Sequence, residues 1–301
     1  MISAVVHTYN EQKNIRRALS SLFFADEIVL IDMGSTDNTK EIAEGFKAKI
    51  YHHAFTGFVE AARNFGISRA KGDWIFILDA DEEVPRALAA KIRALVSKKV
   101  SPVNFFRIPR KNIIFTKWVR HSGWWPDYQI RLFKKGMVSW SDKIHGIPIT
   151  VGAGQDLEIS EGLSIIHHHY DSVGQYLDRL NRYTSIQSRQ RFLKNKKAGL
   201  KELLLSPLQE FVKRFFKEEG YKDGWHGLSL AALQLFSEFI VILKLWELNG
   251  FKDISLKLPE LRQLVVKANR IINYWFANEM LKYKNNPVSS LFLRIMRKIN
   301  S

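Results

Sequence analysis

The chain has 301 residues, of which 46% are hydrophobic and none is a cysteine. This length predicts one large domain or two modest ones, and the apolar content is sufficient for a packed core. The lack of cysteine excludes disulfides and thiolate metal sites. The first residues lack the basic region and apolar core of a signal peptide, so we expect a cytoplasmic protein.

The formal net charge is +16, and it is unevenly distributed. Residues 1–170 contain 23 Lys and Arg against 18 Asp and Glu, whereas residues 171–301 contain 23 against 12. A basic second half predicts an anionic partner: a membrane surface, a nucleic acid or a phosphorylated substrate. Simple solubility is the alternative, and charge by itself does not choose among them.

Short apolar runs alternate with amphipathic segments in the first hundred residues. We predict strands at residues 2–6, 27–31, 48–51 and 74–78, and helices from residue 15 and at residues 40–46, 58–68 and 85–96. Alternation of this kind is typical of a mainly parallel sheet with right-handed crossovers and helices on both faces. Shorter strands are expected at residues 104–108, 113–115, 128–133 and 163–166.

The character of the chain changes to helix after Asp171. Helices are predicted at residues 173–192, 203–216, 228–248, 261–281 and 291–299. The segment 228–248 is apolar, but its polar residues recur every three or four positions and form one stripe, which predicts an amphipathic helix and not a membrane span. We therefore expect an α/β domain at residues 1–170 and a basic helical domain at residues 171–301.

Three polar clusters fall where predicted strands end: Thr8–Glu11, Asp32–Asp37 and Asp79–Asp81. Ligands of open α/β sheets bind outside the carboxyl ends of the strands, so we expect these clusters to share one site. The dinucleotide fingerprint GxGxxG and the P-loop are both missing from the sequence, so a nucleotide would be held in another way.

Asp79 and Asp81 are two residues apart, and on an extended chain they point to the same side. Their oxygen ligands suit Mg²⁺ or Mn²⁺, ions that usually bind protein through one or two carboxylates together with substrate phosphates. We therefore predict a divalent metal held on a nucleotide diphosphate. The alternative is an acidic strand–helix turn in which Glu82 and Glu83 begin the helix that follows Pro85.

Taken together, four motifs resemble the inverting family 2 glycosyltransferases, which have a GT-A fold. The motifs are Thr8-Tyr9-Asn10-Glu11, Asp32-x-Gly-Ser-x-Asp37, Ala62-Arg63-Asn64-x-Gly66 and Asp79-x-Asp81. The resemblance implies that Thr8, Tyr9, Asn10, Glu11 and Asp37 face the base and ribose of a nucleotide, usually uridine. It also implies that Arg63 lies near the diphosphate, and that Asp79 and Asp81 bind the ribose and the metal–diphosphate.

Later segments resemble the branch that adds sugars to the lipopolysaccharide core, of the heptose β-glucosyltransferase type. They are Pro126-Asp127-x-Gln129-x-Arg131-Leu132-Phe133, His145 and the segment Gly220–Gly227. Members of that branch often carry His-Glu where this chain has His145-Gly146. The resemblance places the catalytic base at Asp127, with Arg131 nearby as a phosphate or orienting contact.

Glycosyl transfer also requires a group that takes the proton of the acceptor hydroxyl. Asp127 is the first candidate, with a loop-capping role as its alternative, and His145 is a second candidate for the base or for a metal ligand. The run His167–His169 could complete a metal shell, although histidines at a strand end are more often structural.

The sequence thus predicts a metal-dependent transferase that moves a sugar from a nucleoside diphosphate sugar, with UDP favoured, to a glycan or glycolipid of the cell envelope. The basic helices would contact an anionic membrane, and no nucleic acid is expected as a partner. A transferase acting on a polyprenyl phosphate and a nucleotidyltransferase remain alternatives within the enzymes. A basic nucleic-acid-binding protein is the alternative from another class.

Overall fold

The computed structural model describes residues 1–55, 60–97, 102–140, 148–283 and 287–300. The chain divides into two compact units. The first comprises Met1–Ile114 and Trp125–His169, and the second comprises Phe115–Trp124 and Tyr170–Ser301. Division of the sequence into functional domains at residue 170 stays a prediction. The structure adds the ten residues from Phe115 to Trp124 to the helical part.

One mixed sheet forms the centre of the first unit, with the strand order β3-β2-β1-β4-β8-β6-β12-β5. Its strands are β1 (Ile2–Thr8), β2 (Glu27–Asp32), β3 (Lys49–His52), β4 (Trp74–Asp79), β5 (Glu82–Glu83), β6 (Val103–Ile114), β8 (Asp127–Lys134) and β12 (Ile165–Tyr170). Strand β1 pairs in parallel with β2 and β4, and β2 pairs in parallel with β3. These four strands are the predicted parallel core, and antiparallel strands extend it into a mixed sheet.

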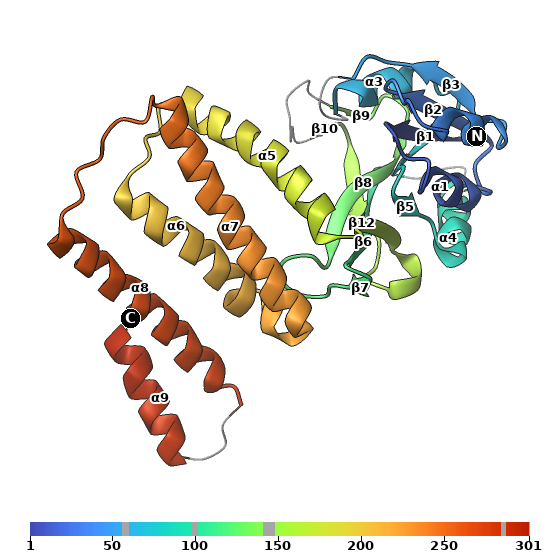
Figure 1. Ribbon diagram of the computed structural model, residues 1–301. Helices are drawn as coiled ribbons and strands as arrows, with labels where there is room; N and C mark the ends of the chain where they lie inside the picture. Colours follow the sequence, from blue (N-terminus) through green and yellow to red (C-terminus); the bar gives the residue numbers. More distant parts are fainter. Residues whose placement is uncertain (56–59, 98–101, 141–147, 284–286, 301) are drawn as a thin grey trace. The chain divides into compact units, whose positions relative to one another are not determined.

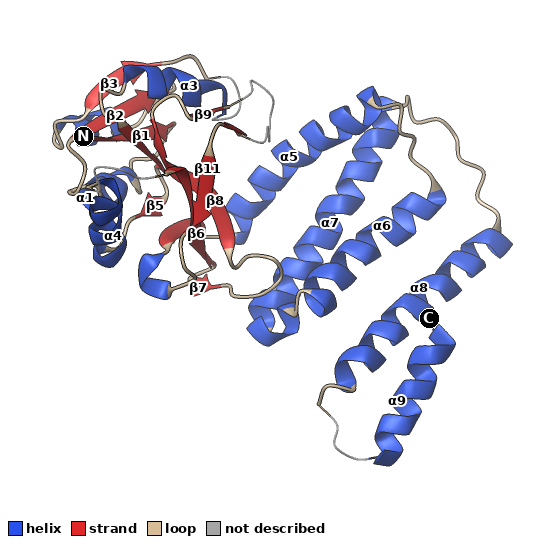
Figure 2. Cartoon of the chain, turned by 180° about the vertical axis from the view of Figure 1, so that it is seen from behind, coloured by secondary structure: helices blue, strands red, loops and turns tan. Residues whose placement is uncertain are grey.

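Helices cover both faces of this sheet, and Figures 1 and 2 show them around the strands. They are α1 (Ile15–Ser21), α2 (Thr39–Glu44), α3 (Glu60–Arg69) and α4 (Arg86–Val96). Side chains alternate along β1: Ala4 and Val6 belong to the cluster that includes α1, α2 and α4, whereas Val5 belongs to the cluster that includes α3. This alternation is the period of two that a strand buried on both faces requires.

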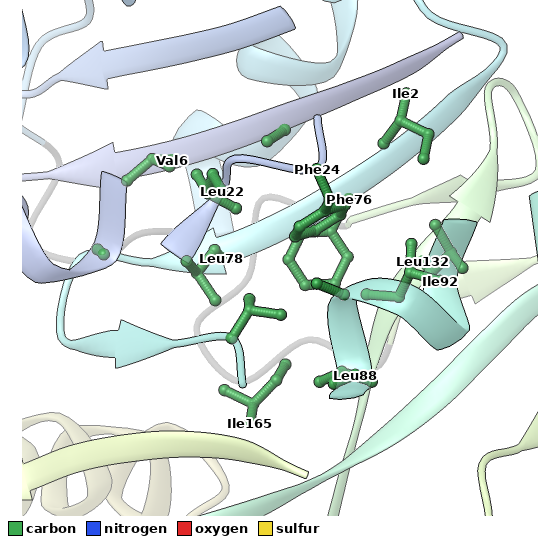
Figure 3. Packing of buried hydrophobic residues seen from close by; sticks show 14 of the residues in the cluster. Ile2, Val6, Leu22, Phe24, Phe76, Leu78, Leu88, Ile92, Leu132 and Ile165 are labelled. Atoms are coloured by element: carbon green, nitrogen blue, oxygen red, sulfur yellow. The ribbon is translucent and has the colours of Figure 1, made fainter. Parts of the chain in front are cut away.

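The larger cluster contains the aromatic centre of the core. The rings of Phe24 and Phe76 meet edge to face with centroids 5.4 Å apart, and Figure 3 shows them among Ile2, Ile92 and Leu132. Each large apolar side chain buried in this way contributes about 1.5–3 kcal/mol relative to an exposed position. The core therefore fixes the strands whose carboxyl ends carry the predicted site.

Two predictions from the sequence, the separate strands after residue 103 and the extended strand through Asp79 and Asp81, were wrong, and so was the alternative for Glu82 and Glu83. Instead of two strands at residues 104–108 and 113–115, Val103–Ile114 form one long strand, β6, in which Pro109 and Arg110 continue the pairing with β8. Glu82 and Glu83 do not begin a helix; they form β5, which pairs with β12 in antiparallel orientation. Strand β5 follows a turn directly after β4, so Asp79 and Asp81 do not lie on one extended strand.

Gly66 allows α3 to pack closely on the sheet. A Cβ atom at this position would lie 2.7 Å from Val5 Cγ1, 2.9 Å from His7 Nε2 and 3.0 Å from Ile31 Cγ1. Two of these neighbours are β-branched side chains with few alternative rotamers, so they have little freedom to move away. The glycine of the motif that begins at Ala62 is therefore explained by the spacing between helix and sheet.

The second unit is mostly helical, as Figure 2 shows. Its helices are α5 (Val173–Leu193), α6 (Leu200–Val212), α7 (Trp225–Leu248), α8 (Leu258–Met280) and α9 (Pro287–Asn300). Helix α7 lies beside both α5 and α6, and α8 lies beside α9. Short strands and turns complete the two units: β7 (Lys117–Trp118), β9 (Val138–Ser139), β10 (Ile149–Thr150), β11 (Ala153–Asp156), η1 (Glu161–Leu163), η2 (Lys213–Lys217) and η3 (Gly220–Asp223).

Helix α7 is long and apolar enough to cross a membrane by length and composition, and 28% of its most apolar window is buried within the structure. Its polar side chains nevertheless have partners on α5. Arg191 forms two hydrogen bonds of 2.7 Å with Glu238, and Lys244 donates to Asn181 Oδ1 at 2.7 Å. These contacts agree with the predicted amphipathic helix that packs against its neighbours.

The segment Gly220–Gly227 holds the loop Phe115–Trp124 within the second unit. The buried carboxylate of Asp223 accepts the backbone N–H groups of residues 120 and 121 at 3.1 and 2.8 Å. The two terminal glycines of the segment lie so close together that a Cβ atom on Gly227 would be 1.8 Å from the carbonyl oxygen of Gly220. The motif therefore has a structural use in shaping the loop that precedes Asp127.

Gly66→Ala is expected to lower the free energy of unfolding by about 1–3 kcal/mol, because the added methyl group overpacks the interface between α3 and β1. Chemical denaturation followed by circular dichroism measures the change. Gly162→Ala is the matched control, since its Cβ atom would meet only Ala87 Cβ at 3.8 Å. Equal effects of the two substitutions would contradict the explanation given for Gly66.

Candidate active site

Two turns at the carboxyl ends of β1 and β2 are hydrogen-bonded to each other. The N–H of Asn10, a residue with a φ of 55°, donates to Ser35 Oγ at 2.9 Å. Asn10 Oδ1 accepts the N–H of Thr36 at 2.8 Å. Asp32 is buried and accepts the N–H of Ser35 at 3.1 Å. The first two predicted clusters therefore form one structure at this edge of the sheet.

Asp37 joins the same two turns. Its carboxylate accepts the hydroxyl of Thr39 at 2.5 Å and the N–H of Gln12 at 3.1 Å, while the N–H of Glu11 donates to Thr39 Oγ1 at 2.9 Å. Partial burial acts to raise the pKa of Asp37, but the hydrogen bonds from Thr39 and Gln12 outweigh it and hold the pKa below its usual value. An ionised carboxylate thus stands at the rim of the turns.

An aromatic pair lies beside these turns. The rings of Tyr9 and Phe55 stack with centroids 4.3 Å apart and an angle of 17° between their planes, and both remain exposed. Thr8 is buried, and its Oγ1 has no hydrogen-bond partner among the described parts of the chain. The exposed aromatic surface is suited to a planar ligand such as a nucleotide base.

His7 connects β1 to α3. Its Nε2 is 3.1 Å from the carbonyl oxygen of Ala62, so this nitrogen must donate. Burial and the nearby Arg63 lower the pKa of His7 to about 3, and the imidazole is therefore neutral at physiological pH. The ring fixes the helix that carries Arg63 without adding a charge to the site.

Helix α3 presents two further residues of the predicted motif. Asn64 forms a two-way contact with the backbone of Trp140, donating to its carbonyl oxygen at 2.7 Å and accepting its N–H at 2.9 Å. The guanidinium of Arg63 lies 5.4 Å from the centre of the Trp140 ring. Arg63 also donates to Asp79 Oδ1 at 3.1 Å. These contacts explain why both residues follow Ala62 in the motif.

Asp79, the last residue of β4, lies between two arginines. Its Oδ1 contacts Arg63, and its Oδ2 accepts Arg131 at 2.6 Å. Burial acts to raise the pKa of Asp79, but Arg131 and Arg63 outweigh it and hold the pKa well below its usual range. Asp79 is therefore ionised, and in this structure both of its oxygens are engaged by cations.

Glu82 extends these contacts into the protein. It is fully buried, and its Oε1 accepts Arg131 at 2.5 Å and Arg110 at 3.1 Å. Its Oε2 accepts the backbone N–H of Asp79 at 2.9 Å. Burial acts to lower the pKa of both arginines, but their carboxylate partners raise it overall, so both stay charged. Glu82 thus bridges the buried guanidinium group of Arg131 and the largely buried one of Arg110.

Asp127 ends this series of ion pairs. Arg110 and Asp127 are direct cross-strand partners on β6 and β8, and Arg110 donates to Asp127 Oδ2 at 2.6 and 2.9 Å. Asn112 also donates to Oδ2, at 3.2 Å, while Gln129 donates to Oδ1 at 2.8 Å. Burial acts to raise the pKa of Asp127, but Arg110 and the two amides outweigh it and lower the pKa. The carboxylate is therefore ionised, with Oδ1 the less occupied oxygen.

Asn112 links Asp127 to a histidine on β12. Because an ionised carboxylate only accepts, the amide nitrogen of Asn112 faces Asp127, and its oxygen faces His167 Nδ1 at 2.6 Å. His167 must then donate through Nδ1, so in the neutral ring Nε2 carries the lone pair. That nitrogen lies 3.5 Å from Asp81 Oδ2. A histidine held through one nitrogen by a neighbouring oxygen is typical of a metal ligand.

The structure brings nearly all of the predicted site residues to one edge of the first unit. In the register of the parallel strands, Thr8 pairs with Asp32 on β2 and His7 pairs with Asp79 on β4. The predicted residues found there are Thr8, Tyr9, Asn10, Glu11, Asp37, Arg63, Asp79, Asp81, Asp127 and Arg131. Their roles in binding and catalysis stay predictions. His145 lies outside the described residues.

Sequence reasoning missed Glu82, Arg110 and Asn112 as members of the site. Arg110 and Asn112 are two residues apart in a strand, and this period of two was a usable signal that they share one face. Glu82 was expected either as part of an acidic stretch that holds a metal or as the start of a helix, and not as a partner of arginines. Its role depends on arginines that lie 28 and 49 residues further along the chain, and no local pattern reveals such a contact.

Two cavities lie away from these residues. The larger measures about 540 Å³ and the smaller about 270 Å³. The larger is lined by Phe23, Phe24, Arg86, Ala89, Ala90 and Arg93, and the smaller by Ala25, Asp26, Glu27, Ile28, Phe46, Lys47 and Lys49. Neither contains a predicted site residue, and the smaller lies at the amino ends of β2 and β3, opposite the candidate site.

A divalent metal fits only part of the predicted ligand pair. Among the residues that the structure describes, no group of three or more His, Asp and Glu is arranged to hold an ion. Asp79 contacts arginines on both oxygens, whereas Asp81 has the oriented Nε2 of His167 beside it. One carboxylate and one imidazole suffice where substrate phosphates supply the remaining ligands. Asp79 as a direct ligand stays a prediction.

Glu82→Gln is expected to lower the free energy of unfolding by about 3 kcal/mol, because it leaves two buried arginines with one counter-charge fewer. Glu83→Gln, on the same short strand, is the matched control, since its side chain is partly exposed and its contacts with His168 and Arg17 are long, at 3.5 and 4.0 Å. We expect less than about 1 kcal/mol for the control. Denaturant unfolding of both variants measures the difference. Similar decreases in the free energy of unfolding would show that Glu82 stabilises the fold no more than Glu83 does.

Two proteins named as glycosyltransferases align with most of this chain. An uncharacterized glycosyltransferase of Rickettsia typhi is 26% identical over 282 residues, which cover 91% of this chain and 92% of the relative. The lipopolysaccharide core biosynthesis glycosyltransferase LpsC of Rhizobium meliloti is 22% identical over 259 residues, which cover 83% of this chain and 94% of the relative.

Solved structures give weaker matches. TarS of S. aureus (residues 1–349) aligns with a TM-score of 0.43 and 16% identity, over 81% of this chain and 88% of that one. A Mycobacterium tuberculosis glucosyl-3-phosphoglycerate synthase in complex with Mn²⁺, UDP and its product aligns with a TM-score of 0.31 and 21% identity, over 36% and 44%. The family model described as glycosyl transferase family 2 matches residues 3–153, half of the chain. The chain therefore belongs to glycosyltransferase family 2 and has the GT-A architecture followed by a helical C-terminal region.

Proposed function

We propose that this glycosyltransferase is a metal-dependent inverting enzyme that moves a sugar from a UDP-sugar to a hydroxyl of a cell-surface glycan or glycolipid, such as the lipopolysaccharide core. The observation that carries the proposal is the unbroken series of ion pairs from Asp79 to Asp127 through Arg131, Glu82 and Arg110. It links the residue expected to bind the donor with the residue expected to activate the acceptor. The name of the Rhizobium relative supports the acceptor class.

The donor would bind across the turns that follow β1 and β2. Tyr9 offers an exposed ring on which uracil could stack, and Asp37 offers an ionised carboxylate to ribose hydroxyls. Arg63 retains a buried Nε for which no partner exists in the described chain. A guanidinium with unused donor capacity is suited to a diphosphate oxygen.

Asp81 and His167 would hold the metal, with diphosphate oxygens completing its ligands. A bound Mn²⁺ or Mg²⁺ would offset the charge that develops on the departing nucleoside diphosphate. Arg63 and Arg131 would supply further positive charge at the same place. Asp79 and Glu82 keep these arginines in position before the donor arrives, so little reorganisation is needed when charge develops.

Asp127 would act as the general base. The acceptor hydroxyl attacks the anomeric carbon in line with the departing diphosphate; the new glycosidic bond forms as the bond to the diphosphate breaks, and the hydroxyl proton passes to Asp127 Oδ1. Arg110 keeps Asp127 ionised, and Gln129 orients the accepting oxygen. No covalent enzyme intermediate is required, so the anomeric configuration inverts.

The enzyme would work on the inner face of an anionic membrane. A glycolipid acceptor presents its hydroxyl at such a surface, and the basic second half of the chain favours attachment there.

Asp81→Asn is expected to abolish the gain in UDP-sugar affinity that Mn²⁺ provides, because the substitution removes the carboxylate ligand. Titration calorimetry with UDP-, GDP- and dTDP-sugars, each with and without Mn²⁺, measures this gain and tests the choice of nucleotide. Asp73→Asn is the control, since Asp73 is exposed and pairs with the N-terminus. If no nucleotide sugar binds the wild-type protein with or without metal, the proposed donor class is wrong.

Asp127→Asn is expected to leave UDP-sugar binding unchanged while lowering turnover by about 10²–10⁴-fold, the usual contribution of a general base. Because the acceptor is unidentified, the rate of UDP-sugar hydrolysis, with water in place of the acceptor, is the measurement. A fall in donor affinity equal to the fall in rate would instead indicate that Asp127 only maintains the structure around Arg110.

A further inference from the structure

The helix pair at the end of the chain leaves much of its apolar surface uncovered. We call α8 and α9 the C-terminal hairpin. Leu293 is buried, and Arg297 on α9 donates to Asn278 on α8 at 3.3 Å, which identifies the side of α9 that faces α8. The remaining faces of the two helices can therefore be compared with this packed side.

Helix α9 exposes a stripe of large apolar side chains. Leu291, Ile295 and Ile299 recur every fourth residue, and Phe292 lies next to them on the same face. Leu291 is 60%, Phe292 66% and Ile299 71% exposed. Arg297 contacts α8 and the buried Leu293 lies on the same side of α9, whereas the exposed stripe lies on another side.

Helix α8 carries a second stripe. Leu258, Val265, Phe276 and Met280 are separated by 7, 11 and 4 residues, which places them on one side of a helix, and all four are exposed. Phe276 also packs edge to face on Phe216 of η2, with ring centroids 4.8 Å apart, so the stripe is partly covered at this position. The segment that leads into α8 adds exposed Phe251, Ile254 and Leu256. An apolar surface of this extent on a folded protein marks an interaction site.

Positive charge accompanies the apolar stripes. Residues 251–301 contain ten Lys and Arg but three Asp and Glu, a net charge of +7. In α9 the charged residues are Arg294, Arg297 and Lys298, and its sequence has no acidic residue. A helix with Leu, Ile and Phe on one face and Lys and Arg beside them is typical of segments that lie in the interface of an anionic bilayer.

We propose that the C-terminal hairpin binds the surface of an anionic phospholipid membrane, with Leu291, Phe292, Ile295 and Ile299 entering the headgroup region and Arg294 and Lys298 contacting lipid phosphates. A second copy of the chain is the less suitable occupant, because apposing two copies of residues 251–301 would bring two net charges of +7 together. The proposal names the surface that makes the membrane contact suggested above, and it depends on neither donor nor metal.

Sedimentation of the full-length protein with lipid vesicles tests the proposal. We expect binding at low salt to vesicles of phosphatidylcholine mixed with phosphatidylglycerol, weak binding to phosphatidylcholine alone, and partial loss of binding at high salt. Absence of binding to the anionic vesicles at low salt would overturn the proposal. UDP-sugar binding is measured on the same preparation, so failure of the proposed function is distinguishable from failure of the membrane contact.

Phe292→Glu is expected to weaken binding to the anionic vesicles by about ten-fold or more, because the phenyl ring that would enter the headgroup region is replaced by a carboxylate. Phe23→Glu is the matched control: Phe23 lies in the first unit, is 64% exposed, and its replacement changes the net charge equally. Equal losses in the two variants would overturn the assignment to α9. Light scattering is the second readout; a wild-type dimer that Phe292→Glu dissociates, with unchanged vesicle binding, would assign the surface to a second copy of the chain instead.

Discussion

The ion pairs around Arg131 are the constraint on which the rest of the first unit depends. Three arginines and three carboxylates meet at the end of β4, and removing such groups from water is costly unless each finds its partner. The partners come from α3, β4, β5, β6 and β8. The strands must therefore pair in the observed register, in which Arg110 stands opposite Asp127. A shift of one residue would turn Arg110 to the other face of the sheet.

Much of this arrangement was predictable from the sequence because it is local and periodic. The strands β1 to β4 are short apolar runs, and their order with the helices leaves few possible topologies. Once a parallel sheet is predicted, the clusters that begin at Thr8, Asp32 and Asp79 must lie along one edge. The resemblance of four motifs to a glycosyltransferase family then supplied roles, and the family was confirmed by the match over residues 3–153.

The contacts within the site were not predictable in the same way. Asp79 and Asp81 were expected to act together on an extended strand, but the chain turns after β4 and Glu82 enters β5. Asp79 consequently contacts arginines, whereas Asp81 lies beside His167. These partners are separated from the acidic run by tens of residues and depend on how β8 and β12 join the sheet. Local pattern gives the residue types that a site needs, while tertiary pairing decides which of them meet.

The positive charge of the chain is distributed differently in its two parts: it is paired with carboxylates near the candidate site and in excess in the C-terminal region. Near the candidate site, Arg63, Arg110 and Arg131 are largely buried and paired with carboxylates, so they add little to the outer field. The excess of +11 belongs to residues 171–301.

Net charge by itself was compatible with either nucleic acid or lipid as a partner. The structure adds that basic residues of α9 lie beside exposed aliphatic side chains. Binding to a phosphate backbone draws its affinity from cations and gains nothing from a stripe of Leu and Ile, whereas a bilayer uses both. The position of the basic residues beside apolar side chains, more than the size of the net charge, therefore favours a lipid interface for the second unit.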